Sequence, residues 1–195
     1  MTTQGELDPA APLCGLYIGQ VVDREDPERL GRVRVRIRGI VEPASAWAFP
    51  LGTVGGGSDR RGFFAVPEKD AEVGILFHQG DVEQPYYLCG HWGRTTGGIE
   101  VPEPARGLSA SDTPKVRVFE TNRFLLAFDD RSGTETLRIQ DKAPGGCEIE
   151  LDGTSMGITI KATSALFLQA DGLVNIQGTT VVINGRVVLP GAKPI

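Results

Sequence analysis

Histidine and cysteine are scarce in this chain and no excess of positive charge is present, and each of these features argues against a class of function. The sequence has 195 residues, with two histidines, His78 and His91, and three cysteines, Cys14, Cys89 and Cys147. No C-x-x-C spacing is present, so buried free thiols are expected in place of a metal cluster or a disulfide framework. The net charge of −5 argues against nucleic-acid binding by overall charge. No cofactor is predicted.

Long hydrophobic runs are also missing. No apolar stretch approaches the length of a membrane span, and no basic segment followed by an apolar stretch opens the sequence. We therefore expect neither an embedded chain nor export by a signal peptide. The 26 glycines and 13 prolines favour many short strands joined by turns over helices. An all-β fold is the prediction.

From residue 158 onward, apolar residues recur with a period of eight. Each repeat holds two apolar residues separated by one, which places both on one face of a short strand. A single ribbon of this kind has one apolar stripe and no layer to cover it, so further copies of the chain are expected to supply that layer. The alternative is the core of one folded chain. The predicted trimer-core residues are Ile158, Ile160, Leu166, Leu168, Val174, Ile176 and Val182.

The clearest strand lies between Gly31 and Ile40, where apolar and charged residues alternate strictly. Val33, Val35 and Ile37 are predicted to face a core, and the arginines between them to face outward. The outward stripe is a candidate contact with an acidic hub or partner, or a solvated strand face. A nucleic-acid face is the alternative, but it also needs exposed aromatic residues beside the charge. The stripe consists of Arg32, Arg34, Arg36 and Arg38.

Turn-forming and strand-forming stretches divide the chain into five parts. Residues 1–13 are expected to form a flexible arm, and residues 14–93 contain about five short strands, enough for a small barrel. Residues 94–114 are rich in proline and glycine and are predicted to be a linker. Strands resume in residues 115–148 as a collar, and residues 149–195 hold the repeats and a tip.

No catalytic site is predicted. Asp129 and Asp130 are the most suggestive carboxylate pair, yet neighbours on a strand point to opposite faces, and the Asp-Asp-Arg-Ser-Gly sequence is typical of a turn. Gly55-Gly56-Gly57 lacks the Lys-Ser/Thr and the helix of a phosphate-binding loop. We expect the protein not to be an enzyme.

Several stretches together resemble a known family. They are GLYIGQVVDREDPERLGRVRVRI, the segment from Trp47 to Pro50, and VPEKDAEVGILFHQGDVEQPYYLCG. In this order they resemble the OB-type barrel of phage baseplate spike proteins (baseplate assembly protein V family) and the related valine-glycine-repeat spike of type VI secretion. The tail, from NRFLLAFDDRSGTETLRIQD onward, is similar to the start of that family's trimeric β-helix.

The resemblance implies an N-terminal OB-type barrel followed by a C-terminal intertwined trimeric β-helix needle. It also implies a homotrimer on a separate baseplate hub protein, at the tip of a contractile tail or injection machine. Such a spike closes the tail tube and pierces the target cell envelope, contacting the outer membrane transiently. The protein would be made in the bacterial cytoplasm and carried in the virion baseplate or an equivalent injection particle.

The sequence departs from some relatives. The linker is too short to contain a lysozyme domain, and no histidine follows His91 to form an iron-holding His-x-His tip. The apolar end of the chain is a candidate platform for a tip-capping protein. Its predicted tip residues are Val188, Leu189, Pro190 and Ile195.

One alternative function belongs to a different class. The barrel is then an OB-type binding module for single-stranded nucleic acid or sugar, and the tail serves only to trimerise it. If the protein is a spike, stable nucleic-acid binding is not expected. If it is a binding module, it should bind either single-stranded nucleic acid or sugar.

Overall fold

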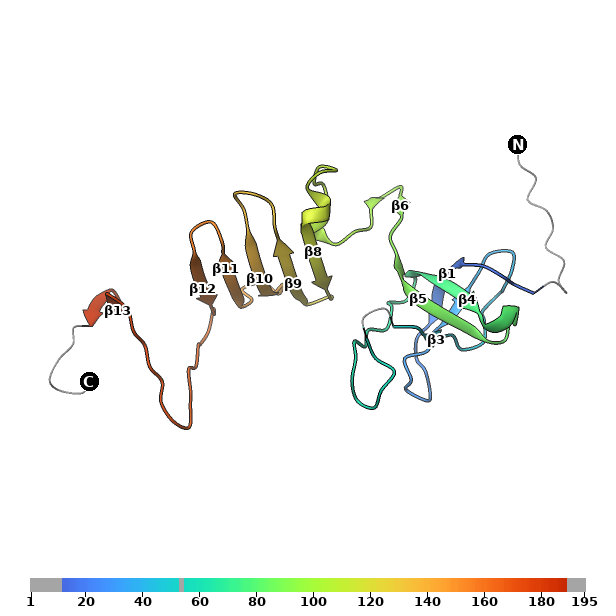
Figure 1. Cartoon of the computed structure of the whole chain (residues 1–195), viewed down its shortest axis with the longest axis horizontal. Coiled ribbons are helices and arrows are strands. Elements are labelled where there is room, and N and C mark those ends of the chain that lie inside the picture. Colours follow the sequence, from blue (N-terminus) through green and yellow to red (C-terminus); the bar gives the residue numbers. More distant parts are fainter. Residues whose placement is uncertain (1–11, 53–54, 189–195) are drawn as a thin grey trace. The chain divides into compact units, whose positions relative to one another are not determined.

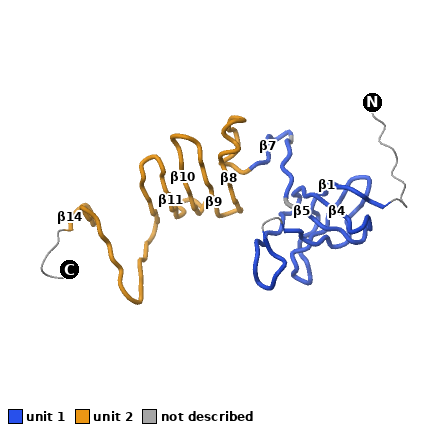
Figure 2. The backbone as a smooth tube through the Cα atoms, viewed as in Figure 1, with its two compact units in different colours: residues 1–101 blue, residues 102–195 orange. Residues whose placement is uncertain are grey.

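The computed structural model describes residues 12–52 and 55–188. Within these residues the chain is built of short strands and three single-turn 3₁₀ helices, η1 (His78–Gly80), η2 (Glu103–Ala105) and η3 (Thr113–Lys115). The chain divides into two compact units, Met1–Val101 and Pro102–Ile195, coloured separately in Figure 2. The predicted all-β class is confirmed. None of the described helices is long and apolar enough to cross a membrane.

The first unit is an OB-like sheet. Its neighbouring strands run in the order β2-β1-β4-β5-β3, of which β1, β4, β5 and β3 are labelled in Figure 1. Val33 pairs with Ala48, which joins the two ends of the sheet. The pair is held by two backbone hydrogen bonds, of 3.1 and 2.8 Å. The strands of this unit are β1 (Tyr17–Asp23), β2 (Arg34–Arg36), β3 (Phe49–Pro50), β4 (Glu72–Phe77), β5 (Pro85–His91), β6 (Arg94–Thr95) and β7 (Gly98–Ile99).

The core of this unit follows the predicted alternation. Val33 and Val35 are fully buried, and Ile37 is 4% exposed. They pack in one cluster with residues from the other strands, because alternate side chains of a curled sheet point inward. The other members of the cluster are Val21, Ala48, Val73, Ile75, Phe77 and Tyr87. The prediction that Val33, Val35 and Ile37 face the core is confirmed.

The turn before β2 is fixed by the carboxylate of Asp26. It accepts backbone N–H groups from Glu28, Leu30 and Arg32, which closes the turn. Next to it, Gly31 has a φ of +75° and lies against the ring of Phe64, where a Cβ would come within 2.6 Å. Only glycine fits this position without displacing the ring.

The second unit contains a single-layer antiparallel sheet with the order β12-β11-β10-β9-β8 (Figure 1). Residues 162–180 carry no strand and lead to a hairpin of β13 and β14. The predicted linker, residues 94–114, contains β6, β7 and η2 and the start of η3. The strands of this unit are β8 (Val116–Glu120), β9 (Phe124–Asp129), β10 (Thr136–Asp141), β11 (Glu148–Asp152), β12 (Gly157–Lys161), β13 (Val181–Ile183) and β14 (Arg186–Val188).

Two cysteines differ from expectation. Cys14 and Cys147 are free but exposed, so the expected burial is wrong for both. Cys147 lies in the turn between β10 and β11, at the rim of a sheet that has only one layer. A side chain at such a rim has little protein around it.

Candidate assembly interface

The β8–β12 sheet has one polar face and one apolar face, because side chains alternate along each strand. On the polar face, Arg138 lies 2.8 Å from Glu150 and 3.9 Å from Glu148 on the neighbouring strand. Lys142 lies 2.7 Å from Glu120 on the same face. These ion pairs are partly exposed, which suits a face in contact with water.

Part of the polar face is covered by the chain itself. The helix η2 packs against β8, and the backbone N–H of Glu103 donates to the Glu120 carboxylate. Leu125 and Ala127, on β9, are 7% and 9% exposed and are the buried hydrophobic residues among those described in this unit. The buried apolar residues Leu125 and Ala127 therefore lie on the polar face of the sheet, where η2 packs.

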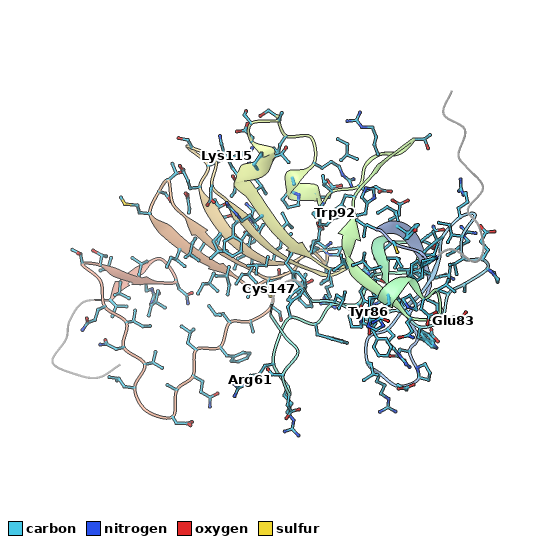
Figure 3. All side chains as sticks on the ribbon, turned by 45° about the vertical axis from the view of Figure 1, so that its right-hand side comes forward. Arg61, Glu83, Tyr86, Trp92, Lys115 and Cys147 are labelled. Carbon is cyan, nitrogen blue, oxygen red and sulfur yellow. The ribbon has the colours of Figure 1, made fainter. Side chains whose placement is uncertain are left out.

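The opposite face is apolar and open. Strand register sets two rows of side chains across it, since Leu137 pairs with both Phe128 and Leu151, and Ile139 pairs with both Leu126 and Ile149. Side chains project from both sides of the sheet in Figure 3. We use the name assembly face for eight apolar residues of this surface, Leu126, Phe128, Leu137, Ile139, Ile149, Leu151, Ile158 and Ile160.

Most of the assembly face is exposed in the single chain. Ile139 is 49% exposed, Ile160 50% and Ile158 70%. Cross-strand contacts hide the remaining parts of these side chains, but no second layer from residues 12–52 or 55–188 covers them. A continuous apolar sheet face of this kind marks an interaction surface, because covering it removes apolar area from water.

Sequence reasoning found only two residues of this face, Ile158 and Ile160. The other six form three earlier pairs with the same spacing of i and i+2. The first members of successive pairs, Leu126, Leu137, Ile149 and Ile158, are 11, 12 and 9 residues apart, and the eight-residue period follows. The i, i+2 apolar pairs are therefore present in the sequence before Ile158, but the longer turns between them make their spacing unequal.

No described part of the chain covers the five remaining predicted trimer-core residues. All five are exposed, from 48% for Val174 to 63% for Leu168 and Ile176. In addition, no backbone–backbone hydrogen bond joins residues 164–180 to any described part of the chain. Folded proteins satisfy nearly all backbone groups. The five residues are Leu166, Leu168, Val174, Ile176 and Val182.

The four arginines of the predicted partner stripe do not form one uniform surface. Arg32 is 7% exposed and pairs with Asp26 at 2.6 Å and Glu28 at 2.9 Å. Its guanidinium also lies over the rings of Trp47 and Phe49, at 5.7 and 5.3 Å from their centroids. The Arg32 hydrogen bond holds the pKa of the Asp26 carboxyl well below its usual range. Arg32 thus stabilises the turn and is not part of an open face.

The other three arginines are more accessible. Arg34 is half-buried and donates from Nε to the Ser45 carbonyl oxygen at 2.8 Å. Arg36 donates to the Gln20 side chain at 2.7 Å, and both Arg36 and Arg38 are exposed. Arg36 and Arg38 are therefore the exposed members of the stripe.

The adjacent carboxylates Asp129 and Asp130 do not form a catalytic pair in the structure. Asp129 pairs with Arg131 at 2.6 Å, and Asp130 pairs with Arg117 on another strand. The Arg131 hydrogen bond lowers the pKa of Asp129. Two carboxylates neutralised by separate arginines do not share a substrate gap.

Among the predicted tip residues, Val188 ends β14 half-buried, and Leu189, Pro190 and Ile195 lie outside the described residues.

Comparison with known proteins identifies the first unit. Residues 17–92 match the family model described as the type VI secretion system/phage-baseplate injector OB domain. The match begins at the first residue of β1 and ends just after β5, so it spans the whole OB-like sheet. No curated protein matches the sequence. The first unit therefore contains an OB domain of the type VI secretion system/phage-baseplate injector kind, which indicates a structural role in a baseplate or injector.

Proposed function

We propose that the protein is the central spike of a contractile tail or injection machine, formed by three copies that close the tail tube and pierce the target envelope. The observation that carries this proposal is the open assembly face, continued by residues 164–180, whose backbone has no hydrogen-bonded backbone partner among the described residues. In the trimer, the face and the eight-residue repeats form one apolar interior. The three-fold number comes from the resemblance to the spike family.

The interwound arrangement explains how a spike resists force. Each copy alone has a sheet one layer thick and a distal segment without strand pairing. Strands supplied by neighbouring copies satisfy the free N–H and C=O groups of that segment, and axial load is then shared by many hydrogen bonds. The injector OB domain supports the place of this needle in a particle, at the end of the tube. A separate hub protein and a tip-capping protein complete the proposed assembly.

The test is the absolute mass in solution of the full chain and of a chain that stops after Thr113. The full chain is expected at three times 20.9 kDa. The shortened chain keeps the OB-like core and loses the assembly face, so it is expected to be a folded monomer. A monomeric full chain refutes the proposal, and a dimer indicates two sheets packed face to face in place of a three-sided needle.

A further inference from the structure

The surface chemistry of the second unit changes sharply at β12. Residues 115–155 contain 14 charged side chains, whereas residues 156–188 contain three, Lys161, Asp171 and Arg186. Many charges of the first stretch form ion pairs on the sheet, as Arg138 does with Glu150. The distal stretch is thus nearly uncharged on all sides.

The distal stretch also has apolar residues on the side away from the proposed trimer interior. Phe167 lies between the inward Leu166 and Leu168, and alternation places it outward, as Thr159 is on β12. Leu173 and Ile183 are adjacent to inward valines and share this outward position. In the structure Phe167 is 87% exposed, Leu173 81% and Ile183 53%. Met156, in the turn before β12, is 90% exposed.

These outward residues fit a lipid environment better than a protein partner. A protein contacts one continuous patch, usually with a polar rim. Here the apolar residues are spread along the segment, and three copies would repeat them on three sides. Hydrocarbon surrounds an inserted object on every side and tolerates no unsatisfied backbone, which the proposed interwound strands would satisfy.

The segment is short enough to lie within the hydrocarbon layer. Its four repeats, which begin at Ile158, Leu166, Val174 and Val182, give roughly 19 Å when stacked at about 4.8 Å, against a hydrocarbon thickness of about 30 Å. Asp171 is the only charged residue between Lys161 and Arg186. Above β12, the ion-paired sheet would have to lose its hydration to go further, and burying paired charges is costly.

We propose that the outer face of residues 156–183 is a lipid-contacting surface anchored by Phe167 and Leu173. The charged β8–β11 sheet stops insertion at β12. This inference rests on the proposed trimeric spike, because only the trimer turns these residues outward and the repeats inward. It specifies which side chains meet the acyl chains and how deep the spike enters.

The experiment measures co-flotation of the full chain with vesicles of neutral phosphatidylcholine at high salt. Binding is expected to persist in salt and to fall at least about tenfold in the double variant Phe167→Ser/Leu173→Ser. The matched control Asn175→Ser, also outward in the same segment, is expected to bind as the original chain does. Asp171→Asn is expected to bind more tightly, since it removes the one charge within the segment.

A second measurement does not depend on loss of binding. A tryptophan placed by Phe167→Trp is expected to be quenched by lipids brominated near the bilayer centre, whereas Thr134→Trp, in the turn between β9 and β10, is not. Equal quenching at both positions, no quenching at residue 167, or binding only to anionic vesicles and lost in salt overturns the inference. Measuring the mass of each sample separates the two failures: a trimer without quenching refutes lipid contact alone, and a monomer refutes the spike.

Discussion

Two neighbouring residues of β12 allow the assembly face to be tested with one matched pair of substitutions. Ile160 lies on the assembly face, and Thr159 lies on the polar face opposite Glu150. Both are exposed in the single chain, with Ile160 at 50%. The two variants are Ile160→Lys and Thr159→Lys. If the single chain were the functional form, both lysines would reach water and both variants would behave alike.

In the trimer the two variants differ greatly. Full burial of an isoleucine is worth about 1.5–3 kcal/mol, and about half of Ile160 remains to be covered, so each copy loses about 1 kcal/mol of association energy. Three ammonium groups would also be brought together in an apolar interior, at a cost of several kcal/mol each. The sum is roughly 10 kcal/mol per trimer, or about seven powers of ten in the association constant. Thr159→Lys gains an attractive neighbour in Glu150 and should change little.

The assay is light scattering at several protein concentrations, with circular dichroism to follow the strands. We expect Ile160→Lys to be monomeric at micromolar concentrations and Thr159→Lys to keep the mass of the original chain. The OB-like unit serves as an internal control, because its near-ultraviolet signal should be the same in both variants. Equal masses for the two variants would refute the assignment of the apolar face to the interior.

Three further predictions concern the OB-like unit, read by thermal unfolding of the chain that stops after Thr113. Asp26→Asn removes a carboxyl whose folded pKa is depressed by Arg32, so the variant is less stable at neutral pH. The difference should shrink as pH falls below about 4, where the unfolded carboxyl takes up its proton, and a difference that is constant with pH would contradict the assignment. Tyr87→Phe loses the 2.7 Å hydrogen bond to the Gly31 carbonyl and should cost about 1–2 kcal/mol; no loss would show that water replaces it. Gly31→Ala should cost more than 1 kcal/mol because of its φ of +75° and the Phe64 ring, and an unchanged midpoint would contradict the close contact.

The barrel was predictable because its pattern is local. Strict alternation around Val35 has a period of two, which identifies a strand and its buried face without knowledge of its neighbours. The sheet places those residues in the core as predicted. The prediction failed for Arg32, whose side chain meets Asp26, six residues earlier, across a turn. Alternation gives the direction of a side chain but not the partner that a turn brings to it.

The assembly face was only partly predictable, for a different reason. The repeats after Ile158 keep one period because the stretches between their apolar pairs have equal lengths in the sequence. Before Ile158 the hairpin turns are longer, so the pairs beginning at Leu126, Leu137 and Ile149 have unequal spacing. Register across neighbouring strands aligns them in spite of this. Only pairing information shows that they share a face.

Hydrogen exchange of the backbone amides in residues 164–180, measured on the purified full chain, tests the interwound needle most directly. These amides have no backbone partner within the described chain, so protection of this segment requires hydrogen bonds from other copies. The proposed needle predicts exchange as slow as in β9 and β10. Exchange at the rate of an unstructured peptide, in a sample of any mass, would contradict it.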